Sequence, residues 1–329
     1  MVKKISPNLG LDLVRVTEAA ALTAGRWMGL GNPDEANHWT SVAMANAFNT
    51  LAIDGHIVIG EEGKLGVHTP LDSGKRVGMG TGTAMDVVAD PIDGAHLLAL
   101  GHADAIAVAG LAPRGSMWKP YPAVYMDKIV VDKTAAPALV PECMDAPAAW
   151  TLALVARAKN KAVRDLIVFV LDRPRHKDLI EEIRAAGARV MSRLEGDIAG
   201  ALMVVLEDVN VDILMGIGGI SEGVIAACAI KSLGGAMLGR LSPQSEGEAN
   251  EVKASGLDVH KILTCDELVK GDDVFFAATG ITDGVILSGV RYEGDRAQTE
   301  SMVLRRRTGT KRLIHAEHLI ESPGEDEIG

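Results

Sequence analysis

Two acidic segments of the chain each follow a run of apolar residues and lie beside glycine. Asp90-Pro91-Ile92-Asp93-Gly94 comes directly after Val87-Val88-Ala89, and Gly60-Glu61-Glu62-Gly63 follows Ile57-Val58-Ile59. Proline and glycine favour a tight bend where a buried strand ends. Carboxylates from two strand ends can form the oxygen-rich site that Mg²⁺ and Mn²⁺ prefer. Two solvated acidic turns are the alternative, but the repetition of the pattern favours one shared metal site.

A pair of arginines follows another predicted strand. Asp172-Arg173-Pro174-Arg175-His176 comes directly after the apolar residues 166–171, the position where open α/β sheets bind their ligands. Guanidinium groups can hold phosphate oxygens in a bidentate manner. The alternative is a solvated helix start, although two arginines there would oppose the helix dipole unless an anion compensated them. We therefore predict phosphate binding at this segment.

A glycine-rich segment, Gly216 to Gly223, follows the apolar residues 211–215 and opens a predicted helix. Backbone N–H groups at such a turn can bind an anion. The segment has neither the GxGxxG nor the GK[ST] spacing, which disfavours a nucleotide cofactor. Glu222 could complete a metal site or only favour the helix N-terminus. In Glu195-Gly196-Asp197 the carboxylates could accept hydrogen bonds from sugar hydroxyls, or form an ordinary surface turn.

Length, charge and cysteine content narrow the class of protein. At 329 residues the chain exceeds one average domain, so we expect a metal-binding α+β lobe over 1–140 and an α/β lobe over 150–329. A net charge of −11 argues against a nucleic-acid partner. Cys143, Cys228 and Cys265 form no CxxC pair, which fits a reducing cytoplasm. No apolar run reaches the roughly 18 to 20 residues of a membrane span, and we expect no secretory signal at the N-terminus, because it has no apolar h-region.

The hydrophobic periodicity predicts helices and strands in both lobes. Helices are expected at 11–30, 36–51, 176–186 and 222–233, and strands at 57–59, 86–89, 129–131, 166–171, 188–191 and 211–215. Residues 198–205 fit either a helix or a strand, and 134–149 are expected to form a connector. The alternation after this connector predicts βαβ units and a mostly parallel sheet.

Taken together, these segments resemble the class II fructose-1,6-bisphosphatase family, the GlpX-type bacterial enzymes. The likeness rests on seven segments in the same order along the chain: Arg15 to Leu22, Ile57 to Glu61, Asp90 to Gly94, Tyr125 to Lys128, Leu171 to His176, Gly216 to Gly219 and Ala278 to Thr282. The resemblance implies a layered α/β/α/β/α sugar-phosphatase sandwich, which is shared more distantly with the inositol monophosphatases.

The resemblance also implies an activity and a set of site residues. It places Glu61, Asp90, Asp93 and Glu222, with Asn37, at positions that bind Mg²⁺ or Mn²⁺. Catalytic positions correspond to Glu61, Asp90, Asp93 and Ala95. Positions around the substrate correspond to Asp93, Gly94, Tyr125, Arg173, Pro174, Arg175, Glu195, Gly196, Asp197 and Gly219. The implied reaction is metal-assisted hydrolysis of the 1-phosphate of fructose 1,6-bisphosphate in gluconeogenesis, with sedoheptulose 1,7-bisphosphate as a second candidate substrate. The implied protein is a cytoplasmic homodimer or homotetramer.

Several residues depart from the family pattern. Asn37 stands where the family has Asp, and Ala95 stands where it has a Thr that helps orient the attacking water. Gly60-Glu61-Glu62-Gly63 replaces a Gly-Glu-Gly-Glu pattern, and Asp93 replaces a glutamate. These changes lie at the reacting end. Two hypotheses follow: the chain is a metal-dependent sugar bisphosphatase, or it is a catalytically weak homologue that binds or senses a sugar phosphate.

Overall fold

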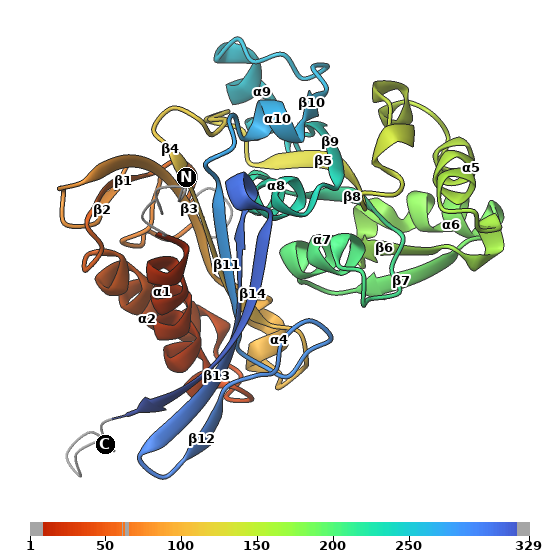
Figure 1. Ribbon diagram of the computed structural model, residues 1–329. Coiled ribbons are helices and arrows are strands. Elements are labelled where there is room, and N and C mark those ends of the chain that lie inside the picture. Colours follow the sequence, from red (N-terminus) through yellow and green to blue (C-terminus); the bar gives the residue numbers. More distant parts are fainter. Residues whose placement is uncertain (1–8, 61, 63–65, 321–329) are drawn as a thin grey trace, which may run out of the picture.

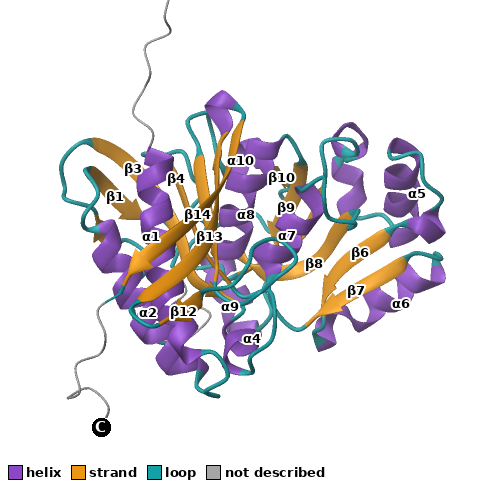
Figure 2. Cartoon of the chain, turned by 60° about the horizontal axis from the view of Figure 1, so that its bottom comes forward, coloured by secondary structure: helices purple, strands orange, loops and turns teal. Residues whose placement is uncertain are grey.

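The structure is a computed structural model that describes residues 9–60, 62 and 66–320. Within these residues the strands form two sheets. The first has the order β12-β13-β11-β4-β3-β1-β2, with β14 also paired to β13, and the second has the order β10-β9-β5-β8-β6-β7. Figures 1 and 2 show the two sheets side by side with helices outside and between them.

The elements follow in a fixed order along the chain. The α-helices are α1 (Leu9–Ala24), α2 (Pro33–Phe48), α4 (Ala95–Ala99), α5 (Ala148–Ala158), α6 (Lys177–Ala185), α7 (Asp197–Val205), α8 (Ile220–Leu233), α9 (Glu246–Ala254) and α10 (Cys265–Leu268). The strands of the first sheet are β1 (Ile53–Ile57), β2 (Arg76–Val77), β3 (Thr83–Asp93), β4 (Ile106–Pro113), β11 (Phe275–Gly280), β12 (Arg291–Glu293), β13 (Arg296–Arg305) and β14 (Thr310–Leu319). Those of the second sheet are β5 (Tyr125–Val131), β6 (Ile167–Leu171), β7 (Arg189–Arg193), β8 (Ile213–Gly219), β9 (Ala236–Leu241) and β10 (Leu263–Thr264).

Five layers are stacked across the molecule. Helices α1 and α2 cover the outer face of the first sheet, and α7 and α8 lie between the two sheets. Helices α5 and α6 cover the far face of the second sheet (Figure 1). The α/β/α/β/α sandwich implied by the resemblance is therefore confirmed as the fold class.

Neighbouring residues of the central strands point into different cores. Val87 and Phe275 pack beneath α1 and α2, whereas Val88 and Phe276 pack toward α8. Alternate residues of a strand face opposite sides of its sheet, and here both sides are covered. This explains why the strands appear in the sequence as continuous apolar runs.

The first sheet collects strands from both ends of the chain. After the second sheet is complete, β11 returns and pairs antiparallel with β4, from Phe275 opposite Leu111 to Gly280 opposite Ile106. Strand pairing thus crosses the expected division between residues 1–140 and 150–329, and that division remains a prediction about folding units.

Some local expectations are confirmed and others are wrong. The strand expected at 57–59 lies earlier in the chain, as β1 over Ile53–Ile57. Residues 198–205, which fitted either type of element, lie in helix α7, and the buried run after Glu222 lies in helix α8. The second sheet is not mostly parallel: β6 pairs parallel with β7 and β8, but β5 pairs antiparallel with both β8 and β9. The βαβ rhythm covers only β6 to β8, because β5 enters from the first sheet and β9 returns after α8. No helix in the described part of the chain is long and apolar enough to cross a membrane.

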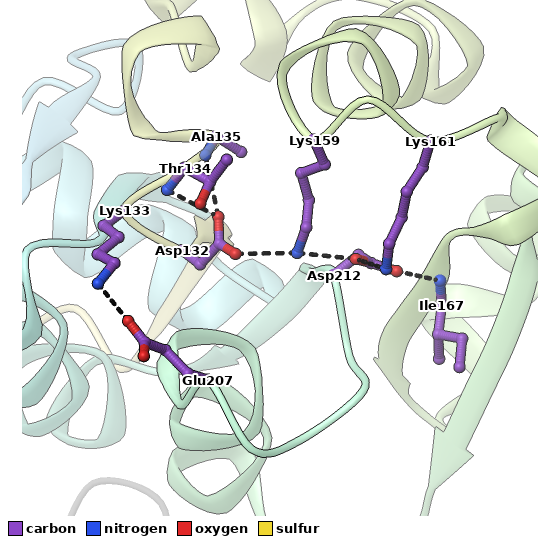
Figure 3. Close-up of polar contacts among 9 residues, drawn as sticks. All are labelled: Asp132, Lys133, Thr134, Ala135, Lys159, Lys161, Ile167, Glu207 and Asp212. Atoms are coloured by element: carbon purple, nitrogen blue, oxygen red, sulfur yellow. Dashed lines mark hydrogen bonds and ion pairs between the residues drawn. The ribbon is translucent and has the colours of Figure 1, made fainter.

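A network of ion pairs closes the second sheet at the end where β5 finishes and β6 and β8 begin (Figure 3). The buried Asp212 carboxylate accepts hydrogen bonds from Lys161 Nζ at 2.7 Å and from the Ile167 N–H at 2.9 Å. Lys159 Nζ lies 2.7 Å from Asp212 Oδ1 and 2.9 Å from Asp132 Oδ2. Burial acts to raise the pKa of Asp212, but the hydrogen bonds from the two lysines outweigh it and leave the pKa below its usual value.

We predict that Asp212→Asn lowers the free energy of unfolding by on the order of 3 kcal/mol, because it leaves the largely buried Lys159 without one of its two anionic partners. Because the pKa of Asp212 is lowered in the folded protein, the wild-type advantage is present above the unfolded pKa of about 3.9. It is lost as the pH falls further, through the folded pKa.

Urea unfolding at pH 7 and near pH 3 checks this prediction. Lys133→Ala is the matched control, because the pair between Lys133 and Glu207 is exposed and should contribute little to stability. Equal losses in the two variants at pH 7 would contradict the role given to Asp212.

Candidate phosphate-binding cleft

A polar cleft of about 390 Å³ opens where strands of both sheets end. Its walls come from β3 and α4 of the first sheet's side, from the residues that follow β6, and from the junctions before α7 and α8. The start of α2 closes the remaining side. Segments that are more than a hundred residues apart in sequence thus meet at one place.

Two buried carboxylates line one wall at the end of β3. Asp90 and Asp93 are each 4 % exposed. Both acids lie in the strand itself, not in a turn after it, and the register with β4 shifts between them. Asp90 Oδ1 accepts a hydrogen bond from the Ile92 N–H at 3.0 Å. The expected bend comes one residue later, at Gly94, whose φ of 101° is left-handed and precedes α4.

A third buried carboxylate enters from the first turn of α8. Glu222 is 4 % exposed and accepts a hydrogen bond from Ser221 Oγ at 2.7 Å. The glycines that we expected to form a strand-to-helix turn lie within β8, which passes at Gly219 directly into α8 without a separate turn. Their role is spatial: a Cβ on Gly219 would lie 1.9 Å from Glu222 Oε2, and one on Gly218 would lie 1.9 Å from Asp197 Oδ2. Glycine at these positions leaves room for both carboxylates.

Two guanidinium groups line the opposite wall. Arg175 donates a hydrogen bond to the Ile217 carbonyl at 2.9 Å and lies 5.4 Å from the centre of the Tyr125 ring. Loss of hydration lowers the pKa of Arg175 from its usual value, and the nearby Arg173 lowers it further. Arg175 nevertheless stays charged, because an arginine is not deprotonated in proteins. The wall is therefore cationic and suited to an anionic group.

The buried His176 holds this arginine segment in place. Its Nδ1 lies 2.7 Å from the Leu171 carbonyl, and its Nε2 accepts a hydrogen bond from the Ile217 N–H at 2.8 Å. Since one ring nitrogen faces an acceptor and the other a donor, the ring is neutral with its proton on Nδ1. Burial lowers the pKa of His176, which keeps it neutral. His176 thereby connects the segment that follows β6 to strand β8.

An ion pair that is buried beneath the cleft connects β5 to α7. Lys128 Nζ lies 2.5 Å from Asp197 Oδ2, and the two side chains are only 1 % and 6 % exposed. Such a lysine requires a partner, since an unpaired buried charge is costly. One carboxylate oxygen of Asp197 is thus committed to Lys128, which the sequence analysis did not assign to the site.

Three hydrogen bonds join α7 and its preceding loop to the acidic wall. Glu195 Oε2 accepts from the His96 N–H at 3.0 Å, and Glu195 Oε1 lies 2.8 Å from His96 Nδ1. Asp93 Oδ2 accepts from the Ala199 N–H at 2.9 Å. Arg173 Nη2 also approaches Glu195 Oε1, at 3.4 Å. Glu195 therefore joins the two walls, and the sugar contact that we expected of it stays a prediction.

The cleft brings together most of the residues that the sequence analysis singled out. Its lining includes Asn37, Asp90, Asp93, Gly94, Ala95, Tyr125, Arg173, Arg175, Glu195, Gly196, Asp197, Gly219 and Glu222. Pro174 does not line it and instead begins a short 3₁₀ turn. Glu61 lies outside the described residues. His96 and Asp34 also line the cleft and were not predicted. His96 had one signal in the sequence, its position two residues after the acidic segment.

The donor chemistry of the acidic wall suits a hard divalent cation. Asp90, Asp93 and Glu222 supply only carboxylate oxygens, which Mg²⁺ and Mn²⁺ prefer. In the part of the chain that the structure describes, no three carboxylate, histidine or cysteine groups are gathered closely enough to hold a metal by themselves. These three residues thus fit a metal in type, and a complete site needs further ligands.

The fold and the cleft define the class of protein: an α/β sandwich with a cleft between buried carboxylates and paired guanidiniums. Comparison with known proteins identifies the family. The family model described as bacterial fructose-1,6-bisphosphatase, glpX-encoded, matches residues 7–318. A class 2 fructose-1,6-bisphosphatase of Haemophilus influenzae is 37% identical over 326 residues, which cover 95% of this chain and 96% of that protein. The class 2 fructose-1,6-bisphosphatase 1 of Escherichia coli K12 is 36% identical over 327 residues, with the same coverage.

The chain therefore belongs to the class II fructose-1,6-bisphosphatase family. This confirms the resemblance found in the sequence. Membership implies a divalent metal requirement, without identifying the metal.

We predict that Asp197→Asn lowers the free energy of unfolding by about 3–5 kcal/mol, because it leaves Lys128 charged and buried without its anion. Chemical denaturation at pH 7 measures this loss.

The double variant Lys128→Met, Asp197→Asn should recover much of the loss, because it removes the buried charge altogether. If the double variant is as unstable as the sum of the two single variants, Lys128 and Asp197 are not coupled.

Proposed function

We propose that this chain is a metal-dependent phosphatase that hydrolyses the 1-phosphate of fructose 1,6-bisphosphate. Family membership supports this reading, because relatives of nearly the same length carry that name. Sedoheptulose 1,7-bisphosphate is a second candidate substrate, since it also carries a phosphate at each end of a sugar.

The observation that carries the proposal is the presence of both kinds of charge in one cleft. Buried carboxylates at the end of β3 line the same cleft as Arg173 and Arg175. A bisphosphate needs two different environments: cations that hold the phosphate that stays, and oxygen ligands that bind a metal beside the phosphate that leaves. The cleft supplies both kinds of group within one cavity of about 390 Å³.

Asp90, Asp93 and Glu222, together with Glu61 outside the described residues, are the proposed holders of Mg²⁺ or Mn²⁺. When bound, such a cation polarises the phosphate and lowers the pKa of a water molecule. Arg173 and Arg175 are proposed to grip the non-reacting phosphate. Tyr125 and Asp197 are proposed to border the sugar, because both line the cleft.

A second candidate function is a binding or sensing protein with weak catalysis. The observation that favours it is the position of Asn37 and Ala95, which both line the cleft. Asn37 is neutral and Ala95 has no hydroxyl group, so each removes a group that the family uses at the reacting end. The arginine wall has no comparable change.

Phosphate release from fructose 1,6-bisphosphate, sedoheptulose 1,7-bisphosphate and their monophosphates, with Mg²⁺ or Mn²⁺, tests the proposal. We expect turnover of at least one bisphosphate that stops when the metal is chelated. Binding by calorimetry without turnover under every condition would instead establish the sensing function.

Arg173→Ala should raise KM by about tenfold or more and leave kcat within a few-fold. A charge-assisted contact is worth about 1.5–3 kcal/mol, and this one belongs to the non-reacting end of the substrate. Arg184→Ala is the matched control, because Arg184 is exposed on α6 and outside the cleft. An unchanged KM in Arg173→Ala would show that Arg173 pairs with Glu195 but does not bind the substrate.

Ala95→Thr should raise kcat while KM changes little, because a hydroxyl at this position can orient the attacking water. A positioned hydrogen-bonding group commonly changes kcat by about 10²–10³-fold. The gain should be smaller here, because the surrounding residues are not adapted to hold the new hydroxyl group. Ala95→Val, which has nearly the same shape as threonine but no hydroxyl, separates the hydrogen bond from the added volume. Equal rates in the two variants would contradict the role of the hydroxyl.

A further inference from the structure

His96 holds a fixed position on the cleft wall although its side chain is largely exposed. It is the second residue of α4, and it donates from both its backbone N–H and its ring to the same carboxylate, that of Glu195. The His96 side chain is 69 % exposed, whereas the Glu195 side chain is only 17 % exposed. Two hydrogen bonds to one partly buried partner restrict both the backbone and the ring.

The contact with Glu195 also sets which ring nitrogen carries a proton. Glu195 Oε1 can only accept a hydrogen bond, so the neutral imidazole has its proton on Nδ1. This leaves a lone pair on Nε2. Among the described residues no hydrogen-bond partner contacts Nε2. A carboxylate, an oriented imidazole and an available second nitrogen form the arrangement that enzymes use to accept a proton.

The elements next to His96 carry several charged groups. Helix α2, which packs against α4, contributes Asp34 to the cleft lining. The neighbouring 3₁₀ turn Gly25–Trp27 contains Arg26, whose guanidinium lies 3.8 Å from the Tyr292 ring centre. Glu195 contacts the ring, and Arg173 approaches the same Glu195 oxygen.

We propose that His96 is the proton acceptor of the hydrolytic step and that Glu195 is its positioning residue; this inference rests on the proposed phosphatase function. The water oxygen forms its bond to phosphorus while one water proton passes to His96 Nε2. The bond between phosphorus and the sugar oxygen breaks, and its electron pair stays on that oxygen, which is protonated by solvent. His96 then returns its proton to solvent, so that one water is consumed in each turnover.

This role compensates for a feature of the chain. Ala95 cannot orient a water molecule by a hydrogen bond, whereas the next residue along α4 carries a group that can both orient water and accept its proton. Both residues line the cleft directly after the Asp90 to Gly94 segment. The reacting end would then keep a means of activating water despite the missing hydroxyl.

His96→Asn tests the proposal most directly. The asparagine amide can still donate a hydrogen bond to Glu195 as Nδ1 does, but it has no nitrogen equivalent to Nε2. We expect kcat on fructose 1,6-bisphosphate to fall by about 10²-fold or more, with KM changed less than threefold. The wild-type kcat should decline as the pH is lowered between about 8 and 5, the range in which histidines change charge. That decline should be absent in the variant.

Two further variants separate positioning from chemistry. Glu195→Gln should lower kcat less than His96→Asn does and should keep the pH-dependent decline, because Nε2 remains. His102→Asn, the same exchange at an exposed residue outside the cleft, should leave both kcat and its pH profile unchanged. Circular dichroism and urea unfolding confirm that each variant is folded.

The outcomes distinguish this inference from the proposed function. Wild-type turnover with an unaffected rate and pH profile in His96→Asn would overturn the role of His96 and leave the phosphatase function standing. Absence of wild-type turnover on every sugar bisphosphate would overturn both. Loss of rate together with the loss of the acidic limb supports the proton acceptor.

Discussion

The burial of α8 between two sheets is the constraint on which the rest of the structure depends. Every residue from Ile220 to Lys231 is buried, and the helix packs against β3, β4, β11 and β13 on one side and β5, β8 and β9 on the other. A helix that is mainly apolar on every face must be covered on every face. By filling the space between the sheets, it brings their strand ends to one place. It also carries Glu222 into the cleft at its first turn.

The charged groups of the cleft can be buried because nearly every one of them already has a partner. Asp197 is paired with Lys128, Asp93 accepts from the start of α7, and Glu195 binds His96 and approaches Arg173. Burying a charge without such contacts would cost several kcal/mol. The same contacts make the site rigid before a ligand binds, which is what positions a bound phosphate for reaction. Site residues and structural residues are therefore partly the same residues.

The departures from the family pattern fall on one side of this cleft. Asn37 and Ala95 belong to the wall that contains Asp90 and Asp93, whereas the arginine wall keeps its residues and the backbone contacts that hold them. Gripping a phosphate needs only cations at a fixed separation, and His176 and Ile217 maintain this. Activating water needs additional groups, and there the chain offers His96 in place of a hydroxyl group.

The sequence by itself determined the family, the layered fold class and most residues of the cleft. Apolar runs that end in acids or arginines mark strand ends, because a strand covered on both faces must be apolar and because polar groups begin where burial ends. This local rule predicted Asp90, Asp93, Arg173 and Arg175 without knowledge of the topology. The same rule was wrong in placing Asp90 and Asp93 in a turn after the strand, since both lie within β3. A strand whose register shifts between two acids has the same sequence pattern as a strand that ends before them.

Only the tertiary structure decided which groups face one another. Lys128 and Asp197 are 69 residues apart, and His96 and Glu195 are 99 residues apart, so neither pair has a local signal. The glycines of β8 were misread for the same reason: a glycine in a turn and a glycine beside a carboxylate from another element look alike in one chain. The partial antiparallel character of the second sheet likewise follows from the entry of β5 from the first sheet. Such pairings depend on how covered sheets stack, and that is set by the whole core together.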